Sequence, residues 1–99
     1  MKVAALVLCM TAGVLPAAHA SDIGKGGDLY LKYCVGCHGA NGRPVMPMAP
    51  DFSRPGALMK PDPMLLATIR GGKGPMPAFQ GLLRDREMLD IVAYLRMMR

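Results

Sequence analysis

The sequence is poor in the large aromatic side chains that usually fill a protein core. In 99 residues it has no tryptophan, two phenylalanines and three tyrosines, and much of its apolar content is methionine, alanine and proline. A chain of this length forms one domain. A domain this small is near the limit of what a single apolar core can stabilise. We therefore expect the fold to depend on something besides its own side chains.

The sequence also lacks an apolar run long enough to span a bilayer. An uncharged, mostly apolar run, Val3 to Val14, follows Lys2 and leads into small residues that end at Ala20. A short basic start, an apolar segment and a small-residue end are the parts of a secretory signal peptide. We predict a cleaved signal peptide over residues 1–20, cleavage after Ala20, and one domain over residues 21–99.

Acidic residues are fewer than basic ones, at 7 against 12, which gives a formal net charge of +5. The basic residues are scattered along the chain, and this argues against nucleic-acid binding and for mild attraction to acidic partners. We expect a monomer with no stable membrane insertion.

Cysteine is scarce too, and its arrangement is the most informative feature of the sequence. Of three cysteines, Cys9 lies in the predicted signal peptide, so only Cys34 and Cys37 remain, followed at once by His38. Cys-x-x-Cys-His is the attachment signature of a covalently bound haem. The two thiols add across the vinyl groups of one porphyrin, and the adjacent histidine can reach the iron.

Two other uses of a Cys-x-x-Cys pair are less consistent with the sequence. A structural zinc site needs four ligands, and the chain has no second Cys-x-x-Cys or His-x-x-x-His. A thioredoxin-like dithiol belongs in a βαβ unit, which the sequence does not indicate. A buried haem would also supply the missing apolar core, so we expect the haem-free chain to fold poorly.

From Gly26 to Leu95 the sequence resembles the class I c-type cytochromes, small bacterial monohaem proteins. They include cytochrome c551-type proteins and the cytochrome c domains of cbb3-type oxidases. The resemblance implies an all-α cytochrome c fold, with three to four helices around one covalently bound haem c. It implies a periplasmic single-electron carrier, not an enzyme, that shuttles between respiratory-chain donors and a terminal oxidase or reductase.

The stretch Gly72–Phe79 resembles the distal-ligand loop of this family, with Met76 between two prolines in a glycine-rich turn. The resemblance implies that His38 is the proximal iron ligand and Met76 the distal one. Thioether ligation favours ferrous iron and raises the reduction potential, as is known for cytochromes c. Met46 and Met48 also lie in a proline-rich loop and remain alternatives to Met76.

The segment Pro50-Asp51-Phe52 resembles the Pro-x-Leu element of the family. The resemblance implies that the Pro50 carbonyl accepts a hydrogen bond from His38, which would fix the tautomer of the ligand and raise its basicity. It also implies that Phe52 lies against the porphyrin.

Three helices are expected outside the haem motif, over residues 26–34, 62–70 and 85–98. In the first, Gly26 and Tyr30 share one face, and the resemblance implies that this face packs on the last helix at Ile91 and Tyr94. Asp62 is expected to cap the second helix and Gly71-Gly72 to end it. The third starts after Arg84, where similar sequences carry a Ser or Thr cap.

Two functional alternatives stay open from the sequence. The chain could be a dedicated haem c subunit of a periplasmic dehydrogenase or reductase complex. If Met76 were not bound, it could be a haem protein with an open sixth site, peroxidase-like or gas-binding.

Overall fold

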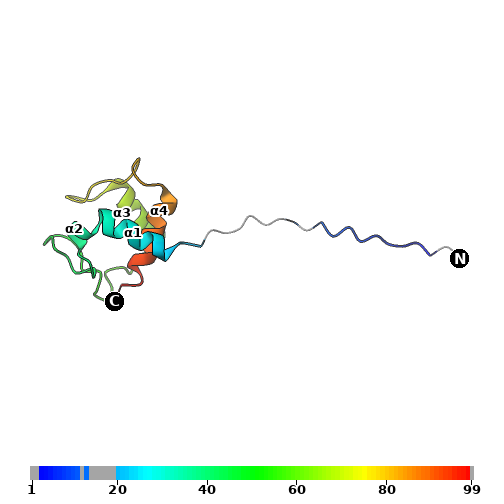
Figure 1. The fold of residues 1–99 in the computed structure, drawn as a ribbon, viewed down its shortest axis with the longest axis horizontal. Coiled ribbons are helices and arrows are strands. Elements are labelled where there is room, and N and C mark those ends of the chain that lie inside the picture. Colours follow the sequence, from blue (N-terminus) through cyan, green and yellow to red (C-terminus); the bar gives the residue numbers. More distant parts are fainter. Residues whose placement is uncertain (1–2, 12, 14–19, 99) are drawn as a thin grey trace.

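The structure is a computed structural model that describes residues 3–11, 13 and 20–98. Its helices are α1 (Ile23–Tyr33), α2 (Val35–His38), α3 (Asp62–Gly71) and α4 (Asp85–Leu95). No β-strand occurs within these residues, which confirms the expected all-α fold. Figure 1 shows α1, α2, α3 and α4 gathered in one domain, with residues 3–11 lying away from it.

Residues 3–11 of the predicted signal peptide are exposed and form no helix. Residues 1–2, 12 and 14–19 lie outside the described part of the chain, so the structure does not bear on most of the region before the expected cleavage site. Among the described helices, none has the length and apolar character needed to cross a membrane.

α1 begins earlier than the sequence predicted, at Ile23 instead of Gly26. The reason is a cap: the Asp22 side chain accepts a hydrogen bond from the Lys25 N–H at 3.0 Å, which satisfies one of the free N–H groups of the first turn. α1 ends at Tyr33, and the chain continues through Cys34 into α2. The haem motif therefore begins at the break between two helices.

The packing of α1 on α4 organises the domain. At Gly26 the backbones approach so closely that a Cβ atom would lie 1.9 Å from the carbonyl oxygen of Asp90. One turn later Tyr30 is fully buried, and its ring lies 5.4 Å from that of Tyr94. The predicted contact of Gly26 and Tyr30 with the last helix is confirmed, and only glycine fits at its closest point.

α3 and α4 differ from the prediction at their ends. Pro61 occupies the N-cap position of α3, so Asp62 lies inside the helix and does not cap it. Instead its carboxylate forms an ion pair with Arg96 at 2.7 Å. α4 ends at Leu95, not Met98. At its start, Glu87 accepts a hydrogen bond from the Arg84 N–H at 3.1 Å, which replaces the missing Ser or Thr cap.

The core lies between α1, α3 and α4, with a contribution from the segment before α4. Its buried apolar residues are Tyr30, Ile69, Phe79, Leu83, Met88, Ile91, Val92 and Leu95. The loop of residues 39–61 provides none of these buried side chains in the described structure. The helices therefore hold the fold, and the loop must be held by other means.

Candidate haem-attachment site

The two cysteines of the motif lie on one tight turn. The N–H groups of Cys37 and His38 both donate to the carbonyl of Cys34, at 3.2 and 2.9 Å. Cys34 is half-buried and Cys37 exposed, and both are free thiols. Burial, reinforced by the neighbouring Cys37, raises the pKa of Cys34 to about 11. The structure thus keeps this thiol in its neutral form at physiological pH.

His38 ends α2 and is half-buried, with its ring stacked on that of Phe52. The ring centroids are 4.7 Å apart and the planes differ by 19°. Burial lowers the pKa of His38, so the imidazole is neutral near pH 7, which is the form that binds a metal. Phe52 thereby contacts the histidine directly, a contact that the sequence did not predict.

The predicted hydrogen bond from His38 to Pro50 is not formed. Nδ1 of His38 is buried and has no hydrogen-bond partner among the described residues. The loop is instead fixed by a bond from the Phe52 N–H to the Gly42 carbonyl at 2.9 Å, and Pro50 stays exposed. Whether Pro50 takes part in binding haem remains a prediction.

Three hydrogen bonds to two backbone carbonyls, which the sequence did not reveal, hold the chain at and just after the motif. The buried Tyr30 hydroxyl donates to the Gly39 carbonyl at 2.5 Å, and burial raises the pKa of Tyr30 to about 12. The N–H groups of Val45 and Met46 both donate to the carbonyl of Cys37, at 2.9 and 3.1 Å. The spacing of Tyr30 indicated its helix face, but no sequence signal indicated its hydroxyl partner.

Met76 lies in a tightly bonded turn that follows α3. Lys73 and Met76 exchange two backbone hydrogen bonds, at 3.1 and 2.9 Å. Gly72 has a φ of 74°, and a Cβ there would lie 2.6 Å from the Met76 carbonyl oxygen. The Met76 side chain is half-buried and packs against the core cluster. A fixed backbone and a sheltered thioether are what a preorganised ligand requires.

The two rival methionines have less support. Met48 is 80% exposed and Met46 is 37% exposed. Neither packs against the core cluster as Met76 does.

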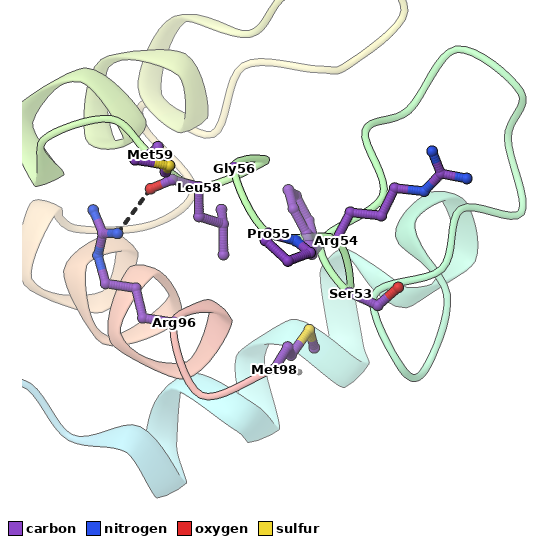
Figure 2. Close-up of a pocket in the computed structure, with 9 residues that line it drawn as sticks. Ser53, Arg54, Pro55, Gly56, Leu58, Met59, Arg96 and Met98 are labelled. Atoms are coloured by element: carbon purple, nitrogen blue, oxygen red, sulfur yellow. Dashed lines mark hydrogen bonds between the residues drawn. The ribbon is translucent and has the colours of Figure 1, made fainter.

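A separate hollow of about 370 Å³ is lined mainly by residues of the segment 52–59, together with Arg96 and Met98 (Figure 2). It shares Phe52 with the candidate site but contains none of the cysteines, His38 or Met76. Arg96 closes one side, where its guanidinium donates to the carbonyls of Leu58 and Lys60 at 2.9 and 2.6 Å. The bond to Leu58 is the dashed line in Figure 2.

The donor set fits a haem c. A haem c needs four side chains to hold it and its iron. The structure provides two thiols on one turn, a neutral imidazole directly after them and a sheltered thioether. Nδ1 of His38 is a buried polar atom without a hydrogen-bond partner among the described residues, as an orphaned group at a binding site can be.

Comparison with known proteins agrees with this fit. Residues 21–95 match the family described as cytochrome c oxidase, cbb3-type, subunit III. The chain is 31% identical to cytochrome c6 of Thermosynechococcus vestitus over 98 residues, which cover 95% of this chain and 86% of the relative. The chain belongs to the class I c-type cytochromes.

Two further relatives describe the range of this similarity. Cytochrome c6 from the diatom Phaeodactylum tricornutum has a similar structure, with a TM-score of 0.65 and 30% identity, covering 76% of this chain and 91% of the other. The gluconate 2-dehydrogenase cytochrome c subunit of Pantoea cypripedii is 30% identical over 88 residues, which cover 76% of this chain but 20% of the relative. This cytochrome carries one covalently bound haem c and is an electron-transfer protein, not an enzyme.

Proposed function

We propose that residues 21–99 form a periplasmic carrier of single electrons, in which Cys34 and Cys37 hold haem c and His38 and Met76 ligate its iron. The haem supplies a one-electron ferric–ferrous couple. With both His38 and Met76 bound to it, the iron would keep no open position for a substrate. Electron transfer through the haem edge is then the remaining activity.

The observation that carries this proposal is the environment of His38 together with that of Met76. Burial keeps the imidazole neutral, and stacking on Phe52 restrains the plane of its ring. The paired backbone bonds of Lys73 and Met76 fix the turn that carries the thioether. Ligands that are already oriented change little between oxidation states, and this keeps the reorganisation that accompanies electron transfer small.

The compartment follows from the leader and the motif together. Haem c is attached outside the bacterial cytoplasm, so the predicted signal peptide of residues 1–20 gives the haem motif the location that it requires. Donors and acceptors in a respiratory chain, ending at an oxidase or reductase, are supported by the match to a family named after a cbb3-type oxidase.

A second candidate function is a dedicated subunit of a dehydrogenase or reductase complex. The similarity to a domain-sized part of a dehydrogenase cytochrome subunit supports it. Gel filtration of a native extract separates the two possibilities. A free carrier elutes as a small monomer, whereas a dedicated subunit elutes with its complex.

The test of the ligand pair compares two methionine variants of the holo-protein. We expect Met76→Ala to remove the charge-transfer absorption band of ferric Met–iron ligation and to let the ferrous protein bind CO rapidly. The matched control Met48→Ala should retain the band and bind no CO. The reverse result would make Met48 the ligand, and rapid CO binding by the wild type would defeat the electron-carrier proposal in favour of an open sixth site.

A further inference from the structure

A second hollow lies where the folded domain begins, at the opposite end of α1 from Cys34. It measures about 300 Å³ and is lined by Ala20, Ser21, Arg86, Leu89 and Asp90. The expected signal-peptide cleavage falls between the first two of these residues. The hollow is therefore the place where processing would create a new chain terminus.

A buried carboxylate faces this terminus. Asp90 is only 4% exposed, and its Oδ1 accepts a hydrogen bond from the Asp22 N–H at 2.8 Å. A carboxylate can accept several hydrogen bonds, and burying its charge is costly unless donors or an opposite charge compensate. The nitrogen of Ser21 precedes that of Asp22 by one residue, a separation of roughly 3 Å in any backbone conformation.

Processing changes the chemistry of the Ser21 nitrogen. In the precursor it is a neutral amide with one N–H, whereas in the processed chain it is an ammonium with a full charge and three donors. A cation at the start of a helix is unfavourable because of the helix dipole, and Ser21 lies just before the Asp22 cap of α1. An ammonium at Ser21 therefore requires a counter-ion, and Asp90 is in place.

We propose that this hollow is a binding site for the α-ammonium group of the chain's own processed terminus, with the Asp90 carboxylate as its counter-ion. The proposal rests on the proposed cleavage after Ala20. Because the Asp90 carbonyl also lies against Gly26 at the closest point of the α1–α4 contact, the ion pair ties the new terminus to the central packing of the fold. Removal of the leader thus stabilises the domain as well as releasing it.

The experiment compares two holo-proteins, one that starts at Ser21 and one that retains His19 and Ala20. Each is made with Asp90 and with Asp90→Asn, a change that keeps an oxygen acceptor for the Asp22 N–H and removes the charge. In the wild-type background, retention of the two residues should lower the folding equilibrium constant about three- to tenfold. In Asp90→Asn the effect should be less than about twofold. An equal loss in both backgrounds overturns the proposal.

A second measurement does not depend on the variant. NMR titration of the Ser21 α-amino group in the ferrous protein should give a pKa above that of the same amine in a peptide of the first residues. A pKa equal to or below the peptide value overturns the ion pair.

The processed terminus must also be identified, by mass spectrometry of the exported protein. A terminus other than Ser21 overturns the cleavage proposal and this site together. Neither a failed ion pair nor a different terminus changes the result expected in the Met76 test. Failure of this site is therefore distinguishable from failure of the electron-carrier proposal.

Discussion

The helical frame of this cytochrome and the loop of residues 39–61 are held in different ways. α1 and α4 meet with their backbones in contact at Gly26 and carry most of the fully buried side chains. The loop of residues 39–61 has no fully buried apolar side chain in the described structure. It is held by backbone hydrogen bonds to the haem motif and by the Arg96 side chain. The frame therefore has a protein core of its own, whereas the loop depends more on what it encloses.

The largest expected effect comes from removing haem attachment, by the double change Cys34→Ser and Cys37→Ser. Without the haem, the loop loses the apolar body against which it packs, and a domain this small has little stability to spare. We expect no pyridine haemochrome signal and loss of the cooperative thermal transition by circular dichroism. A haem-free protein that melts like the holo-form would show that the frame supports the loop unaided.

The next effect concerns the frame itself. Gly26→Ala would place a methyl group 1.9 Å from the Asp90 carbonyl oxygen, so α1 and α4 must separate. Overpacking of this kind costs about 1–3 kcal/mol or more, to be measured by denaturant unfolding of the holo-protein. The control is Gly71→Ala, where nothing lies within 4 Å of the added Cβ. Equal effects of the two substitutions would refute the close approach.

A smaller effect is expected where the loop meets the ligand. Phe52→Leu keeps an apolar side chain but removes the stacking on His38, which we expect to cost about 0.5–1.5 kcal/mol. Denaturant unfolding measures the cost. Phe79→Leu serves as a comparison, because it removes an edge contact with Tyr33 in the frame and leaves the His38 ring alone. If Phe52→Leu alters the ferric spectrum and Phe79→Leu does not, the loop aromatic orients the ligand.

The smallest effect is a pH dependence at the start of α4. Hydrogen bonding to the Arg84 N–H lowers the pKa of Glu87 below its ordinary 4.5. A lowered folded-state pKa stabilises the protein above the unfolded pKa, and this contribution is lost as the pH falls from about 4.5 through the folded value. Glu87→Gln should flatten the stability profile in that acidic range and slightly lower the stability at pH 7, where the ionised carboxylate makes its full contribution. An unchanged acid limb would mean that the carboxylate does not cap the helix.

The frame was more predictable from the sequence than the loops, for a physical reason. Helical spacing predicts the helix face on which Gly26, Tyr30 and Ile91 lie, because residues four apart in a helix share a face. Helix ends were less predictable. The Asp22 cap adjoins the expected cleavage site and was not recognised, and Glu87 substitutes for a cap from a position inside the helix.

In the candidate site, the covalent motif followed from its spacing, but the contacts around it did not. The hydrogen bond from Tyr30 to Gly39 and the stacking of Phe52 on His38 are two such contacts. Each joins residues on either side of a turn, where the sequence has no periodic pattern. The hydrogen bond expected from His38 to Pro50 depends on how the proline-rich loop folds back toward the motif. In the structure this part of the loop is fixed by the hydrogen bond from the Phe52 N–H to the Gly42 carbonyl. Such contacts are set by backbone geometry that residue type alone does not encode.

Arg96 gives the long loop between α2 and α3 a fixed point near its far end, through bonds to Leu58, Lys60 and Asp62. These bonds shorten the part of the loop after His38 that has no attachment to the helices. Loop-closure entropy changes only slowly with length, by about 0.6 kcal/mol per doubling, so the tie adds little to stability. What the tie fixes is position, because it holds the part of the loop next to α3 against the C-terminal end of α4.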